Sequence, residues 1–242
     1  MAVVNKAACS GCGRCVPYCP VAAIAVQDHT ADVNLADCVE CGVCFSFDIC
    51  PEKALSAGEL EWPRTLRAEF SSPCIIHKKT GISGRGTEEM KTNDLTNRYK
   101  DGDVGICIEM GRPGTGTTFR DIEKVAKAVL QVEGVVIEPM NPVVALMVDS
   151  TGKIREDILD EKILSGIIEV LLPLAKTREV LTVLQKVESE VDTVFSVGCV
   201  TKVAPDGSLP PLEIAKEMGI WVSPNCKTNM GIAALVQERR PT

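Results

Sequence analysis

Eight cysteines lie within the first fifty residues of the chain and repeat one pattern. The first run has the spacing C-x2-C-x2-C-x3-C and is followed directly by Pro20, and the second run ends directly before Pro51. The two runs consist of Cys9, Cys12, Cys15 and Cys19, and of Cys38, Cys41, Cys44 and Cys50. Closely spaced cysteine triplets with a fourth cysteine before a proline are typical of iron–sulfur ligation. The pattern therefore predicts that these eight thiolates bind two 4Fe–4S clusters.

Two other uses of cysteine agree less well with this spacing. Structural zinc sites take their ligands in pairs, whereas these cysteines form triplets with a remote fourth member. Disulfide frameworks are typical of secreted proteins, and residues 1–8 do not have the charged and apolar segments of a signal peptide. We therefore expect a cytoplasmic, reducing and oxygen-poor (anaerobic) environment.

Residues 1–58 contain an internal repeat, in which residues 9–24 align with residues 38–55. This stretch resembles the bacterial-type ferredoxins that carry two 4Fe–4S clusters. The resemblance implies that the fourth ligands cross over between the runs. Cys50 would then join the first triplet at one cluster, and Cys19 would join the second triplet at the other. The chain departs from the family in one place, because five residues instead of three separate Cys44 from Cys50.

The rest of the chain has the pattern of a mixed domain. Cysteine density falls at residues 59–64, where Pro63 interrupts local structure, so we expect a second domain over residues 65–242. Apolar patterning predicts helices over residues 119–132, 158–172, 178–191 and 212–218, and strands over residues 66–70, 103–110, 135–137, 143–148, 193–200 and 220–222. The predicted fold class is α+β, with a two-cluster ferredoxin-like module followed by a layered α/β domain.

Composition narrows the possible partners. The chain has 242 residues, 45% of them hydrophobic and only 4% aromatic, which indicates a largely aliphatic core. The net charge of −7 argues against nucleic-acid binding and suits docking to a basic patch on another protein. No uncharged apolar run reaches the ~18 residues that a membrane span requires.

Three polar loops of the second domain are candidate ligand sites. The first lies between a predicted strand and helix, where backbone N–H groups of a glycine-rich turn favour phosphate or carboxylate binding. Its candidate residues are Gly111, Arg112, Gly114 and Gly116. An ordinary strand-to-helix turn is the alternative, because the spacing is neither a dinucleotide fingerprint nor a Walker loop.

The other two loops are less specific. Residues 83–94 lie in a polar segment, residues 78–100, that is too long for a simple connection. Asn225 and Lys227 follow the end of a predicted strand, where ligands bind in open sheets. A solvated loop is the alternative for both.

Four cysteines and two histidines fall outside the two runs. Cys107 and Cys199 lie in apolar predicted strands and are expected to pack in the core, whereas Cys226 is expected to be exposed. Together with Cys74 these cysteines have no spacing that would favour a third cluster. His29 and His77 are expected to be surface or hydrogen-bonded residues rather than ligands.

Two main functions follow from these observations. The first is an electron-transfer subunit that relays low-potential electrons to or from a partner oxidoreductase, either a larger redox subunit or a ferredoxin or flavoprotein. The second is a reductase whose own C-terminal domain binds a flavin or a small anionic or ring substrate, although no motif supports flavin. Residues 83–94 and 111–116 are similar to ferredoxin-fused reductases of the 6-hydroxynicotinate type. A redox-sensing regulator ranks last, because no basic stripe is present.

Overall fold

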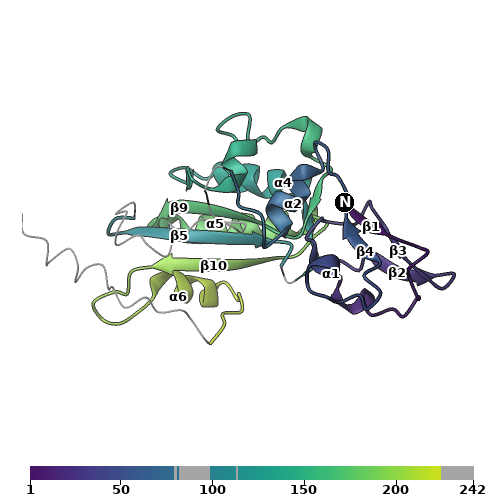
Figure 1. The fold of residues 1–242 in the computed structure, drawn as a ribbon. Helices are drawn as coiled ribbons and strands as arrows, with labels where there is room; N and C mark the ends of the chain where they lie inside the picture. The colour runs from purple at the N-terminus through teal and green to yellow at the C-terminus, as the bar shows by residue number, and fades with distance from the viewer. Residues whose placement is uncertain (79–80, 82–98, 113, 225–242) are drawn as a thin grey trace, which may run out of the picture.

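The structure, a computed structural model, describes residues 1–78, 81, 99–112 and 114–224. Its buried side chains form two separate cores, one within residues 2–55 and one within residues 66–215. Figure 1 shows the N-terminal module, residues 1–58, at one end of a sheet that belongs to the C-terminal region, residues 65–224.

The N-terminal module consists of short elements around its cysteines. These are β1 (Ala2–Val4), a 3-10 turn (Val16–Tyr18), β2 (Ile24–Gln27), β3 (Thr30–Val33), α1 (Val43–Ser46) and β4 (Leu55–Ala57). β1 pairs with β4 and β2 pairs with β3, both antiparallel. The turn between β2 and β3 has positive φ at both Asp28 and His29, which is the backbone of a tight two-residue hairpin.

The C-terminal region is built on an antiparallel sheet with the strand order β10-β5-β9-β7. The strands are β5 (Asp103–Met110), β7 (Val136–Ile137), β9 (Gly166–Pro173) and β10 (Phe195–Thr201). The helices are α2 (Thr65–Ser71), α4 (Phe119–Leu130), α5 (Thr177–Val187) and α6 (Pro210–Glu217). A short pair, β6 (Thr117–Thr118) with β8 (Lys162–Ile163), lies at the start of α4. α4 packs against α5 and β9, and α6 packs against α5 and β10.

Buried apolar side chains on alternate residues of the strands and on one face of each helix stabilise this region. Along β5 every second residue is buried, from Val104 to Met110, and α4 buries Ile122, Val125 and Val129 in the same core. Burial of each such side chain contributes about 1.5–3 kcal/mol relative to exposure. Thr118 accepts a hydrogen bond from the Asp121 N–H and so caps α4.

Several predicted elements are confirmed. The strand at residues 103–110 is β5, the helix at 119–132 is α4, the helix at 178–191 is α5, and the helix at 212–218 is α6. The strands at 135–137 and 193–200 correspond to β7 and β10. The mixed helix-and-strand character of the fold prediction is therefore correct.

The predicted helix over residues 158–172 is wrong, because most of this segment forms β8 and β9. β9 buries Ile168, Val170 and Leu172 on one face and half-buries Ile167 and Leu171 on the other, so apolar residues occur on both faces and a helical period does not distinguish the two structures. The β-branched residues Ile167, Ile168 and Val170 favour a strand. An ideal Cβ on Gly166 would lie 2.5 Å from Ile122 Cδ1, so this glycine lets β9 approach α4 closely.

Three of the predicted strands are also wrong. Residues 66–70 lie in α2, and residues 143–148 lie mostly in a 3-10 helix (Pro142–Leu146). The Asn141 side chain accepts a hydrogen bond from the Val143 N–H and so caps that helix, which is a common use of asparagine before a helical turn. Residues 220–222 pair with no strand in the part of the chain that the structure describes.

Glu123 on α4 stabilises the C-terminal region through a charged hydrogen bond. Its carboxylate accepts the Ile154 N–H at 2.7 Å and pairs with Lys127 at 2.5 Å. Burial opposes ionisation, but the bonds from Lys127 and the Ile154 N–H outweigh it, and the pKa of Glu123 is lowered. A carboxyl group whose pKa is lower in the folded than in the unfolded chain stabilises the fold at pH values above its unfolded pKa, which is about 4.3 for glutamate. This stabilisation is lost as the pH falls through the folded pKa.

We therefore expect Glu123→Gln to reduce the free energy of unfolding by about 1–2 kcal/mol at pH 7, since a charged hydrogen bond and an ion pair become neutral. The deficit should be constant from pH 8 to pH 5.5 and shrink below about pH 4. Denaturation followed by circular dichroism across this range measures it. A deficit that changes between pH 8 and 5.5 would contradict the assignment to Glu123.

Candidate iron–sulfur centres

The eight cysteines of the N-terminal module line two cavities, four to each. The first cavity is lined by Cys9, Cys12, Cys15 and Cys50, and the second by Cys19, Cys38, Cys41 and Cys44. Each cavity thus combines one triplet with the last cysteine of the other run. This grouping is the one that the resemblance to two-cluster ferredoxins implies.

Backbone N–H groups point at cysteine sulfurs in both halves of the repeat. The Ala23 N–H lies 3.1 Å from Cys19 Sγ, and the Ala54 N–H lies 3.3 Å from Cys50 Sγ. Each donor comes four residues after its cysteine, beyond the proline, so the repeated sequence produces the same local turn twice. N–H bonds to sulfur stabilise thiolate charge and tune cluster potentials.

The protonation preferences of the cysteines differ with their surroundings. N–H groups of Ala31 and Gly11 lower the pKa of Cys9, whereas burial raises the pKa values of Cys15, Cys38 and Cys41. Burial, followed by the nearby Cys41 and Cys38, raises the pKa of Cys44 to about 12. Crowded thiolates of this kind require cationic charge among them, and iron supplies that charge when a cluster is bound. The donor set and the N–H groups therefore fit 4Fe–4S clusters.

The two cavities differ in exposure. Each cavity has one cysteine buried in the apolar core of the module, Cys15 in the first and Cys44 in the second, but only the first also has an exposed cysteine, Cys12. At Gly11, φ is +66° and an ideal Cβ would lie 2.3 Å from the His29 carbonyl oxygen. Only glycine allows this approach of the first cysteine loop to the hairpin turn.

The longer spacing between Cys44 and Cys50 forms a compact loop. α1 ends within it, Ile49 is buried in the module core, and Phe47 is 59% exposed. Asp48 has a φ of +50°, which turns the chain back toward Cys50. The departure from the family spacing is thus accommodated locally.

A single metal ion, as distinct from an iron–sulfur cluster, is bound by several side chains grouped around one point. Within the described residues, no group of three or more His, Cys, Asp or Glu side chains is arranged to hold one metal ion. His29 is exposed, and His77 is buried edge-on against Phe70 at 5.2 Å between ring centroids.

The predicted anion site at residues 111–116 lies against the N-terminal module. An ideal Cβ on Gly116 would be 3.3 Å from Val21 Cγ1, and one on Gly114 would be 3.7 Å from the Pro20 carbonyl oxygen. Arg112 forms an ion pair with Glu109 at 3.0 Å. This loop therefore touches the residues that directly follow Cys19.

The first N–H groups of α4 already have acceptors within the protein. Phe119 and Arg120 donate to the carbonyls of Glu161 and Leu159, at 3.3 and 2.8 Å. The Asp121 N–H donates to Thr118 Oγ1 at 3.2 Å. Anion binding by Gly111, Arg112, Gly114 and Gly116 stays a prediction, and it would have to use other groups of the loop.

The remaining candidates are distributed as follows. Residues 83–94 lie outside the described residues, as do Asn225, Cys226 and Lys227. Cys107 is half-buried, while Cys74 and Cys199 are exposed. The prediction that Cys199 packs in the core is wrong, because β10 is an edge strand whose central residues are exposed.

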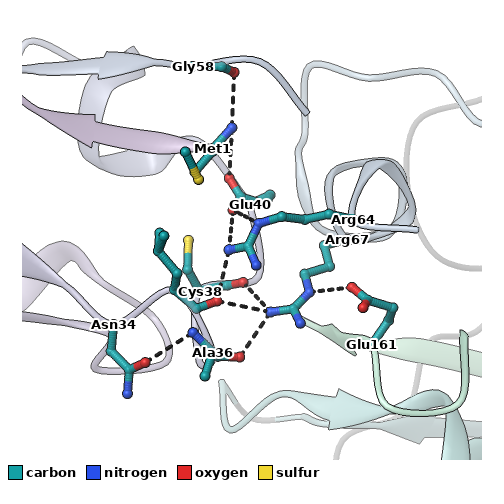
Figure 2. A network of polar contacts seen from close by, with 10 residues as sticks. Met1, Asn34, Ala36, Cys38, Glu40, Gly58, Arg64, Arg67 and Glu161 are labelled. Carbon is teal, nitrogen blue, oxygen red and sulfur yellow. Dashed lines mark hydrogen bonds and ion pairs between the residues drawn. The ribbon is translucent and has the colours of Figure 1, made fainter. Parts of the chain in front are cut away.

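Sequence reasoning missed a polar network between the module and the C-terminal region. Arg67 on α2 donates to three backbone carbonyls around Cys38 and pairs with Glu161, and Arg64 pairs with Glu40 (Figure 2). The spacing of two arginines three residues apart was the available signal, since such residues share a helix face. It was concealed by the wrong prediction of a strand at residues 66–70.

Comparison with known proteins agrees with this geometry. The sequence model of the 4Fe-4S dicluster domain family matches residues 1–77. A stretch of 52 residues is 38% identical to one subunit of the ion-translocating oxidoreductase complex of Methanosarcina acetivorans, covering 22% of this chain and 19% of that protein. The match thus spans about a fifth of the relative, and no solved structure matches the chain. These similarities support 4Fe–4S clusters and a role in iron–sulfur electron transfer.

None of the helices in the described residues is both long and apolar enough to cross a bilayer.

Proposed function

We propose that this chain, whose residues 1–77 match the 4Fe-4S dicluster domain, relays low-potential electrons between two clusters and a partner oxidoreductase. The observation that supports the proposal is the division of eight cysteines between two cavities, with the last cysteine of each run lining the cavity of the other run's triplet. Cys9, Cys12, Cys15 and Cys50 hold one cluster in this proposal, and Cys19, Cys38, Cys41 and Cys44 hold the other.

The C-terminal region serves in this proposal as a docking domain. We propose that residues 65–242 belong to one layered α/β domain beside the ferredoxin domain of residues 1–58; within the described residues, Gly114 and Gly116 lie close to Pro20 and Val21 of that domain. The acidic chain, with a net charge of −7, meets a basic surface of a larger redox subunit or of a ferredoxin or flavoprotein. The setting we propose is an oxygen-poor cytoplasm.

Native mass spectrometry of protein purified anaerobically from its own cells tests this function, with iron, sulfide and flavin measured on the same sample. We expect about eight irons per chain and a stoichiometric partner subunit whose association weakens as salt rises. A chain that elutes alone with bound flavin would contradict the proposal and favour a self-contained reductase. A chain with zinc and no sulfide would contradict both.

A further inference from the structure

The segment that surrounds Cys38 is held from outside the N-terminal module. Arg67 Nη1 donates to the carbonyl oxygens of Ala36 and Cys38, both at 2.9 Å (Figure 2). It also donates to the carbonyl oxygen of Leu35 at 3.3 Å. Arg67 belongs to α2, about thirty residues further along the chain. One guanidinium therefore fixes three carbonyls next to a predicted cluster ligand.

Arg67 is itself fixed on its other side. Its Nε donates to Glu161 Oε2 at 2.6 Å, and the two side chains are only 8% and 16% exposed. Charge-assisted hydrogen bonds of this length are strong, and a buried arginine is tolerated only when its donors are satisfied. The side chain thus forms a rigid connection between the C-terminal region and the Cys38 loop.

Two further cations bind the same segment. Arg64 donates to the Leu35 carbonyl at 2.8 Å and to Glu40 Oε1 at 2.7 Å. Lys162 on β8 pairs with Asp37 at 2.8 Å. Every cation here has an acidic partner, so the loss of any one leaves excess negative charge beside the cavity of Cys38, Cys41, Cys44 and Cys19.

The first cavity, lined by Cys9, Cys12, Cys15 and Cys50, has different surroundings. In the described part of the chain, residues 9–15 and Cys50 receive no side-chain hydrogen bond from the C-terminal region, and Arg14, which lines that cavity, is exposed. Negative charge near a cluster disfavours its reduction, since reduction adds an electron. The two clusters therefore differ in how closely the C-terminal region controls them.

Building on the proposed function, we propose that Arg67 is a positioning residue that couples the C-terminal region to one cluster, the one held by Cys19, Cys38, Cys41 and Cys44. The reduction potential of this cluster is higher with the Arg67 guanidinium in place than it would be without it. The effect acts through the charge of the guanidinium and through its hydrogen bonds to the Cys38 loop, and not through contact with iron.

Redox titration followed by electron paramagnetic resonance tests this inference. Each cluster is observed separately in a background that removes the other, Cys12→Ser for the Cys38 cluster and Cys41→Ser for the Cys9 cluster. We expect Arg67→Met to make reduction of the Cys38 cluster about tenfold less favourable, which equals about 59 mV for one electron, and to leave the Cys9 cluster unchanged.

Three further variants separate charge from shape. Arg67→Met combined with Glu161→Gln restores the charge balance and should recover most of the potential. Arg67→Lys retains the charge but cannot bond the three carbonyls and Glu161 at the same time, as Nη1 and Nε of the arginine do, so it should broaden the signal of the Cys38 cluster alone. Arg120→Met removes an exposed arginine paired with Asp160 and should change neither cluster.

Each outcome decides the question. Selective loss of about four irons in Arg67→Met would support the inference, because only one cluster then depends on the hydrogen bonds that Arg67 makes to the Cys38 loop. Equal shifts at both clusters, loss of both clusters in Arg67→Met, or full cluster signals with unchanged potentials would overturn it. Absence of two clusters from the unaltered protein would instead overturn the proposed function, whatever Arg67 does.

Discussion

A Cys12→Ser protein is expected to contain about four irons per chain instead of about eight, with sulfide reduced in proportion. Serine offers a poorly ionised hydroxyl in place of a thiolate, so the cluster of the first cavity loses a ligand. Cys12 is the exposed cysteine of that cavity, so its replacement removes no packing from the module core. Iron and sulfide analysis after anaerobic purification measures the effect.

The matched control for this change is Cys199→Ser. Cys199 is also exposed, but it lies on β10 in the C-terminal region, away from both cavities. The same chemical substitution there should leave the iron content unchanged. An unaltered iron content in Cys12→Ser, or a reduced one in Cys199→Ser, would refute the ligand assignment.

A Phe70→Ala protein is expected to lose about 3–5 kcal/mol of the free energy of unfolding of its C-terminal core. Phe70 is 1% exposed and meets Phe119 edge-to-face at 5.3 Å between ring centroids. It also contacts His77 edge-on. Its removal leaves a cavity at α2, the helix that carries Arg67, so the Cys38 cluster should be released at lower denaturant concentration than in the unaltered protein.

Denaturation followed by circular dichroism and by the visible absorbance of the clusters measures both effects. The control is Trp221→Ala, because Trp221 is 80% exposed and its loss should change stability by less than about 0.5 kcal/mol. If both variants had similar midpoints, Phe70 would not be an anchor of the core. If Phe70→Ala lowered the protein midpoint but left cluster release unchanged, α2 would not transmit the damage to the Cys38 loop.

The sequence alone determined the features that depend on neighbouring residues. The cysteine spacing predicted iron–sulfur ligation because the ligands of each triplet lie within seven residues, and the family match at residues 1–77 supports that chemistry. The alternation in β5 and the helical periods of α4 and α5 were readable because each has one buried face.

Only the tertiary structure decided the features that depend on distant residues. β9 has apolar residues on both faces, one face buried and the other half-buried, so its apolar run carried no period that separates a strand from a helix. Arg67, which bonds the Cys38 loop, pairs with Glu161, which is 94 residues away in the sequence, and no local pattern predicts that pair. The glycine loop at residues 111–116 suggested a ligand site, but the fold places it against Val21 of the module. These contacts arise because packing two cores together selects partners by shape and charge, irrespective of their separation in the chain.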